Sequence, residues 1–184
     1  MIPNDKVSGQ SKLYQIEWIE ISYPIFLIIG RPFNHRETMK IPKKILIPID
    51  GSSPSNKAFS TGITLTKSLQ SEATVLYVID SSVRLPPPFE SVEVSTVVRL
   101  MEKETKSMVK SLLKEYMTRG KEAGVDISSK LANGNVAKEI IKISSQYDLI
   151  IMGSVGQGTL TSILMGSVAE KVARYADCSV MIVR

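Results

Sequence analysis

The sequence predicts a doubly wound α/β fold, in which a five-stranded parallel sheet carries helices on both faces. Three observations lead to this prediction. Short runs rich in β-branched residues recur along the chain, segments of ten or more residues with helical periodicity separate them, and turn residues end several of the runs. Connections of that length are crossovers, and crossovers make parallel sheets that are covered on both sides.

The first strand and the first helix are predicted between residues 43 and 70. Lys43 to Ile49 forms a β-branched run that Asp50-Gly51 ends. The following stretch, SSPSNKAFSTGITLTKSLQ, predicts a helix with Ser53 as N-cap and Pro54 at the first helical position. Its apolar face is predicted from the spacing of Ala58, Gly62, Leu65 and Leu69.

The next elements are a strand at residues 73–80, a proline-rich loop and a long helix. The strand is apolar enough to predict burial on both of its faces. In the loop, Pro86, Pro87 and Pro88 exclude a helix. The helical pattern of the long helix ends near Gly120 and Gly124. Its core-facing side chains, with the methionines as filler, are expected at Val94, Val97, Met101, Met108 and Leu112.

The remaining elements continue the alternation. Strands are expected at residues 125–132, 148–152 and 179–183, and helices at 136–145 and 163–176. In such sheets ligands bind beyond the carboxyl ends of the strands, where the strand order reverses. Asp50-Gly51 and the segment from Gly153 to Gly156 both follow predicted strands. We therefore expect the functional site where these two turns lie.

The composition is that of an ordinary globular domain. Of 184 residues, 43% are hydrophobic and 22% charged, and the net charge of +5 comes from scattered basic residues. Because aromatic residues do not interleave with them, a solvated surface is favoured over a nucleic-acid site. The single cysteine, Cys178, excludes an intrachain disulfide and a thiolate metal cage. It is expected to be a small buried residue and fits a reducing, cytoplasmic setting.

Residues 1–38 do not follow the pattern of residues 39–184, which we take as the domain. Their apolar stretch IFLII is too short to cross a membrane, for which about 20 apolar residues are needed. Glu17 and Glu20 precede it, whereas a secretory signal has positive charge there. We hypothesise that Met39 is a natural start and that the extension is an appended arm or an artefact of gene-start assignment. The alternative is that YPIFLIIG forms an extra strand or a packing arm.

A glycine pattern follows the fourth predicted strand: Gly153-x-x-Gly156, nine further residues, and then Gly166-Ser167. Glycine lets backbone N–H groups approach a ligand, and a helix N-terminus adds positive dipole character, so phosphate is the ligand that this pattern favours. The chain lacks the P-loop pattern, and Gly156-Gln157-Gly158 lacks the third glycine of a dinucleotide fingerprint. A purely structural role for the glycines stays open.

The stretches KKILIPIDGS, VLYVID and DLIIMGSVGQGTLTSILMGSVAEKVARYADCSVMIVR together resemble the universal stress protein family. ATP-binding members of that family carry the pattern G-x2-G-x9-G-[S/T], which this chain matches in full, and the resemblance covers about three quarters of the chain. It implies an adenine-nucleotide alpha-hydrolase-like sheet that holds ATP or AMP, with magnesium or manganese bound through the phosphates. It also implies a homodimer built by pairing last strands.

The resemblance assigns a role to each site residue. Asp50, the backbone around Ile49 and Val78 would line the adenosine pocket, Met152 and Gly153 would border the ribose, and the phosphates would lie on the later glycine segments. The full nucleotide-binding set is Pro48, Ile49, Asp50, Val78, Met152, Gly153, Gly156, Gly166, Ser167 and Val168. A carboxylate at Asp50 suits ribose hydroxyls or a metal ion, although a turn-stabilising role in the sequence DGS is the alternative.

The chain departs from the family at two positions in and after the first glycine loop. Many members have His, Arg or Lys there, where this chain has Val155 and Gln157. A neutral donor to phosphate is worth roughly half of a charge-assisted one, so we expect binding of moderate strength that depends on the metal ion.

The sequence indicates no catalytic residue. The only histidine, His35, lies in the extension, which excludes a Ser-His-Asp or Cys-His arrangement within the domain. We therefore favour an ATP-binding regulatory protein of the stress response, whose occupancy changes how its dimer or its loop at residues 81–93 meets a protein partner that the sequence does not identify. The alternatives are a slow ATP-hydrolysing or ATP-using enzyme and a domain that has lost its ligand. The final run CSVMIVR, β-branched and without proline, is an edge that favours self-pairing.

Overall fold

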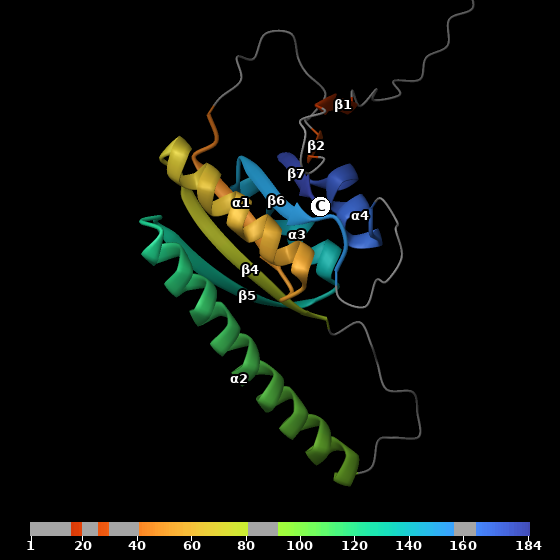
Figure 1. The fold of residues 1–184 in the computed structure, drawn as a ribbon. Helices are drawn as coiled ribbons and strands as arrows, with labels where there is room; N and C mark the ends of the chain where they lie inside the picture. The colour runs from red at the N-terminus through yellow and green to blue at the C-terminus, as the bar shows by residue number, and fades with distance from the viewer. Residues whose placement is uncertain (1–15, 20–25, 30–40, 81–91, 157–164) are drawn as a thin grey trace, which may run out of the picture.

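The computed structural model describes residues 16–19, 26–29, 41–80, 92–156 and 165–184. These residues form a sheet of seven strands in the order β1-β2-β7-β6-β3-β4-β5 (Figure 1). The strands are β1 (Ile16–Ile19), β2 (Phe26–Ile29), β3 (Lys44–Ile49), β4 (Glu72–Asp80), β5 (Ile127–Gly134), β6 (Leu149–Gly153) and β7 (Ser179–Val183).

The five strands from β7 to β5 are parallel, as the sequence predicts. The order reverses beside β3, because the chain first adds β4 on one side of β3 and later adds β6 on the other. The carboxyl ends of β3 and β6 therefore flank the switch point at which doubly wound sheets bind ligands. Asp50 directly follows β3 and Gly153 is the last residue of β6, so both reach this point.

Helices cover both faces of the sheet, which confirms the predicted fold class (Figure 1). They are α1 (Ser53–Leu69), α2 (Val92–Glu122), α3 (Val136–Ile143), a 3-10 turn η1 (Ser144–Gln146) and α4 (Ser167–Tyr175). Alternate residues of β3 point to opposite faces: Ile45 and Ile47 pack with α1 and α2, while Leu46 packs with α3 and α4. Two hydrophobic layers thus hold the sheet from both sides.

The N-cap of α1 lies one residue before the predicted cap. Ser52, not Ser53, is the N-cap, with extended backbone and a side chain that accepts a hydrogen bond from the Ser55 amide at 3.3 Å. Two adjacent serines compete for this role, and only the first places its oxygen near the third helical amide. Of the predicted apolar face, Ala58 and Gly62 are buried, and Leu65 and Leu69 are half-buried against the same core.

The prediction that Met108 faces the core is wrong. Its side chain is 73% exposed, and α2 packs instead through Val109, Leu113 and Tyr116. The buried face is displaced by one residue because these three side chains follow the helical period as closely as the predicted set and also meet α1 and the sheet. Leu112 is half-buried against that core. The loop prolines and the side chains of Val94, Val97 and Met101 lie outside the described residues.

The predicted helix at residues 163–176 is shorter in the structure, where α4 begins only at Ser167. Gly166 has extended backbone, with φ −78° and ψ 161°, and serves as the N-cap. The Gly166-Ser167 pair therefore opens a helix rather than lying within one. Residues 163 and 164 lie outside the described residues. The other predicted elements agree with the structure to within about two residues, the usual scatter of element ends.

Part of the N-terminal extension forms strands. β2 pairs antiparallel with β7, with Leu27 opposite Ile182 and Ile29 opposite Val180, and β1 pairs antiparallel with β2. The alternative prediction of an extra strand within YPIFLIIG is thus confirmed, and the outer edge of β7 is paired within the chain. Among the described residues, no helix is long and apolar enough to cross a membrane.

Candidate functional site

Asp50 lies at the switch point and contacts both the turn that follows it and the first glycine loop. Its carboxylate oxygen Oδ1 accepts a hydrogen bond from the Ser52 amide at 2.9 Å, and its own amide donates to Ser55 Oγ at 3.1 Å. The other carboxylate oxygen, Oδ2, faces Gly156, where an added Cβ would lie 2.8 Å from it. Asp50 therefore stabilises its turn and also borders the glycine loop.

The three motif glycines are needed for close approach of chain segments. None of them has positive φ, which among the described glycines occurs at Gly51, Gly124 and Gly134. A Cβ on Gly153 would lie 2.9 Å from the Pro54 carbonyl carbon and 3.0 Å from the Ser55 amide nitrogen. The loop after β6 is therefore pressed against the start of α1. This contact supports the structural role that the sequence left open for Gly153.

The two glycine segments are joined by a hydrogen bond in the structure. The Gly166 amide donates to the Ser154 carbonyl at 2.7 Å, and an added Cβ on Gly166 would lie 3.3 Å from that oxygen. Ser154 is 4% exposed, and its amide donates to the Val183 carbonyl at 2.8 Å. The backbone of Ser154 thus connects the glycine loop to α4 and to β7.

The N-terminus of α4 has the chemistry of an anion site. Its N-cap, Gly166, has no side chain to accept the first helical amides, and Ser167 is exposed. The unpaired amides and the dipole of a helix N-terminus attract negative charge. Because the Gly166 amide is hydrogen-bonded to the Ser154 carbonyl, the N-terminus of α4 lies beside the first glycine loop. Gly156 of that loop lies against the Asp50 carboxylate.

The apolar members of the predicted set do not gather in one place. Val78 and Met152 are buried at 9% and 6% exposure in the core between the sheet and α3 and α4, against which the half-buried Val168 also packs. Ile49 is buried on the opposite face with α1 and α2. Pro48 is half-buried and pairs with Leu76 of β4. The side chains of these residues therefore belong to the two hydrophobic cores on opposite faces of the sheet.

Tyr77 is a site residue that the sequence reasoning missed. It is half-buried, pairs with Ile49 at the end of β3, and has a phenol pKa raised by burial and by the negative charge of Asp50. The phenol keeps its proton at neutral pH and can donate a hydrogen bond. The sequence signal for Tyr77 was its position next to Val78, because adjacent residues of a strand point to opposite faces of the sheet. The backbone hydrogen bonds of Ser154 to Gly166 and Val183 are contacts that only the fold reveals.

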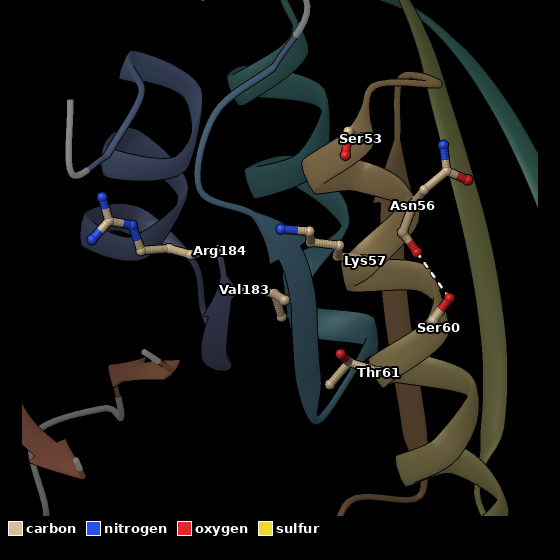
Figure 2. A pocket seen from close by; sticks show the side chains of 7 residues that line it. All are labelled: Ser53, Asn56, Lys57, Ser60, Thr61, Val183 and Arg184. Atoms are coloured by element: carbon tan, nitrogen blue, oxygen red, sulfur yellow. Dashed lines mark hydrogen bonds between the residues drawn. The ribbon is translucent and has the colours of Figure 1, made fainter. Parts of the chain in front are cut away.

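A cavity of about 400 Å³ lies between α1 and the end of β7 (Figure 2). It is lined by Ser53, Asn56, Lys57, Ser60, Thr61, Val183 and Arg184. None of the ten predicted nucleotide residues lines it. Figure 2 shows Lys57 and Thr61 extending from α1 toward the side on which Val183 and Arg184 lie. Among the described residues, no group of three His, Cys, Asp or Glu side chains is placed to hold a metal ion.

Comparison with known proteins gives a consistent result. Residues 42–184 match the universal stress protein family. Universal stress protein MJ0531 of Methanocaldococcus jannaschii is 35% identical over 144 residues, which are 77% of this chain and 82% of that protein. The solved structure of hypothetical protein MJ0577 is 27% identical with a TM-score of 0.66, over 78% of this chain and 96% of that chain.

Two more distant structures share the fold and contain adenine nucleotides. A universal stress protein in complex with cAMP is 20% identical with a TM-score of 0.58, over 79% of this chain and 98% of that one. The Arabidopsis thaliana protein At3g01520, with AMP bound, is 22% identical with a TM-score of 0.54, over 77% of this chain and 91% of that one.

Proposed function

This chain belongs to the universal stress protein family, and from that premise we propose that it binds ATP or AMP and acts as a regulatory protein through nucleotide-dependent conformation or partner binding. The proposal includes magnesium or manganese held through the phosphates, a cytoplasmic location and a role in a stress response. The protein partner is not identified by the chain's chemistry.

One observation carries the proposal: the hydrogen bond from the Gly166 amide to the Ser154 carbonyl. It joins the first glycine loop to the N-terminus of α4, so the amides of both segments can bind one oligophosphate. The nucleotide's phosphates would lie on Gly156, Gly166, Ser167 and Val168. Its ribose would lie near Asp50 and Gly153, where a carboxylate can accept hydrogen bonds from the two hydroxyls.

Relatives support the choice of an adenine nucleotide. The two related structures that hold AMP and cAMP have the same fold over more than three quarters of this chain. In this chain the first glycine loop carries Val155 where many members place a cation, so the phosphate charge would be neutralised by the metal ion and by the α4 dipole. We therefore expect affinity to fall when the metal ion is removed.

The proposed homodimer would pair β7 with β7 of a second copy. In the structure of the single chain, β2 lies on that edge. A dimer through β7 therefore requires the N-terminal strands to be absent or displaced. This competition is tested below.

Two measurements test nucleotide binding directly. The first denatures freshly purified protein and identifies any released small molecule by mass spectrometry. The second titrates the protein with ATP in a calorimeter, with magnesium and then with a chelator. Release of ATP or AMP, or metal-dependent heat of binding, supports the proposal. Absence of both at millimolar ATP overturns it and favours a domain that has lost its ligand. The same samples, assayed for phosphate release, measure any hydrolysis.

A further inference from the structure

The turn that carries Asp50 is connected by hydrogen bonds to the long helix α2. The Asp50 amide donates to Ser55 Oγ of α1 at 3.1 Å, and the next residue of α1, Asn56, is hydrogen-bonded to Tyr116 of α2. The Tyr116 hydroxyl donates to Asn56 Oδ1 at 2.9 Å. The network therefore runs from the candidate nucleotide site across α1 to α2.

Asn56 closes the network on the turn itself. Its amide nitrogen Nδ2 donates to the Ser52 carbonyl at 3.1 Å and to the Gly51 carbonyl at 3.4 Å. Its Oδ1 accepts from both Tyr116 and Arg119, the latter from Nη1 at 3.1 Å. One side chain of α1 thus binds two carbonyls of the Asp50 turn on one side and two residues of α2 on the other.

The α2 end of the network is rigidly packed. Tyr116 is 1% exposed, and its ring meets Phe59 of α1 edge-on, with ring centroids 4.6 Å apart. The Arg119 guanidinium lies 4.7 Å from the Phe59 centroid and 5.1 Å from that of Tyr116. Such cation–π contacts favour one position of the guanidinium.

The protonation of Tyr116 fixes the direction of its hydrogen bonds. Burial raises the pKa of its phenol, the neighbouring Ser55 hydroxyl and Arg119 lower it by less, and the charges of Glu115 and Asp50 raise it by smaller amounts. The phenol therefore keeps its proton and donates it to Asn56 Oδ1. Breaking this hydrogen bond would leave a buried polar atom without a partner, which restricts the movement of both groups.

We propose that Tyr116 is a positioning residue of the nucleotide site, which holds the Asp50 turn through Asn56 and couples nucleotide occupancy to α2. The coupling rests on the proposed nucleotide binding, whereas the bracing of the turn stands without it. Residues 103–108 of α2 are all exposed, and Figure 1 shows the first half of this helix extending beyond the sheet. The network therefore reaches a helix whose residues 103–108 are exposed in the part of the chain that the structure describes. A ligand shifts a conformation only through contacts that differ between states, and this network supplies such contacts.

The test replaces the phenol by Tyr116→Phe, which keeps the ring and removes only the hydroxyl. Tyr175→Phe, on the exposed surface of α4, is the matched control. Hydrogen exchange is first measured without nucleotide. We expect the peptide covering residues 50–56 to exchange about 5-fold faster in Tyr116→Phe, the effect of losing one net hydrogen bond, and to be unchanged in Tyr175→Phe. Equal exchange in Tyr116→Phe and the unaltered chain would show that the Tyr116 hydroxyl does not hold the Asp50 turn in place.

Exchange is then measured with saturating Mg-ATP. In the unaltered chain we expect nucleotide to slow exchange in the peptide covering residues 109–122, and in Tyr116→Phe we expect this protection to be lost and affinity to fall about 5-fold. If nucleotide binds the unaltered chain without protecting that peptide, the coupling is wrong. If nucleotide does not bind at all, the proposed function fails, and the exchange without nucleotide still decides whether Tyr116 braces the turn.

A second variant guards against misfolding of Tyr116→Phe. Asn56→Ala removes the shared acceptor from the α1 side, and we expect the same faster exchange at residues 50–56. Because both residues belong to one network, the double variant should show less than the product of the two single effects. Independent effects would contradict the network.

Discussion

The Gly166 amide and the Ser154 carbonyl lie 2.7 Å apart, although eleven residues of sequence separate the two. Gly166 is the N-cap of α4 and, as a glycine, has no side chain that could accept a hydrogen bond from the first amides of the helix. The same peptide groups that close the turn also aim the first amides of α4 at the space beside the glycine loop. The predictions below separate the contribution of these amides from the packing role of the glycines.

Ser167→Pro removes one backbone donor at the N-terminus of α4. Proline is favoured at the first helical position, and the extended backbone of Gly166 suits the residue before a proline, so the helix should keep its stability. Loss of one amide donor to a charged phosphate should weaken Mg-ATP binding by about 10-fold or more. Titration calorimetry and a thermal melt measure the two effects.

The control for this variant is Ser53→Pro, the same substitution at the first residue of α1, where the N-cap Ser52 is also extended. We expect its affinity for Mg-ATP to match that of the unaltered chain. Unchanged affinity in Ser167→Pro, with the helix intact, would show that the amide of Ser167 does not bind the phosphates.

Gly153→Ala should lower stability. Its added Cβ would meet backbone atoms, the Pro54 carbonyl carbon at 2.9 Å and the Ser55 amide nitrogen at 3.0 Å, and backbone at the start of a helix cannot yield as a side-chain tip can. Overpacking of this kind costs about 1–3 kcal/mol. Urea denaturation measures the loss, and an unchanged midpoint and slope would show that α1 moves away freely.

Much of the fold was predictable because its signals are local. The buried run at residues 148–152 is β-branched and apolar, and it predicts β6 at Leu149–Gly153 almost to the residue. The errors occur where local signals are equivalent. Ser52 and Ser53 are both good caps, Met108 and Val109 are both apolar, and the apolar stretch before Gly166 hides the start of α4.

The candidate site was predictable in part. The predicted fold places the turns after β3 and β6 at one edge of the sheet, and in the structure Asp50 and Gly156 lie against each other there. The network through Tyr116 and Asn56 was not predictable, because these residues lie 60 positions apart and neither carries a motif. Contacts of that range depend on how α1 and α2 pack, which periodicity does not specify.

Gly156→Ala should affect binding rather than stability. Gly156 is exposed, and among the described residues its added Cβ would meet the end of the Asp50 side chain, with Oδ2 at 2.8 Å. The carboxylate can shift while Oδ1 keeps its hydrogen bond from the Ser52 amide, but Oδ2 would then move away from the proposed position of the ribose. We expect affinity for Mg-ATP to fall about 5-fold, the worth of roughly one hydrogen bond. Gly153→Ala, in contrast, is expected to lower stability, so denaturation of the two variants distinguishes the two glycines. A large loss of stability in Gly156→Ala, or full affinity, would refute this assignment.

The N-terminal strands and a second copy of the chain compete for the outer edge of β7. Two β7 strands related by a twofold axis must run antiparallel, and β2 already pairs with β7 in that direction at Leu27, Ile28 and Ile29. An exposed strand edge favours pairing, so we expect β7 to pair with β2 where the N-terminal strands are present and with β7 of a second copy where they are absent. We expect the full chain to be a monomer of 20.3 kDa and the chain shortened to residues 39–184 to have twice its own mass in light scattering at tens of micromolar. The shortened chain should fold, because this chain's match to MJ0577 spans 96% of that protein.

The full chain allows the same test without truncation. Leu27→Pro with Ile28→Pro removes two amides from β2, and proline is excluded from central strands, so the edge of β7 should open and the dimer form. Paired prolines at Ser8 and Gly9, outside the described strands, serve as the control and should leave a monomer. If the shortened chain and the Leu27 and Ile28 variant both stay monomeric, β7 is not a dimer edge. If the full chain is already dimeric, β2 does not block association.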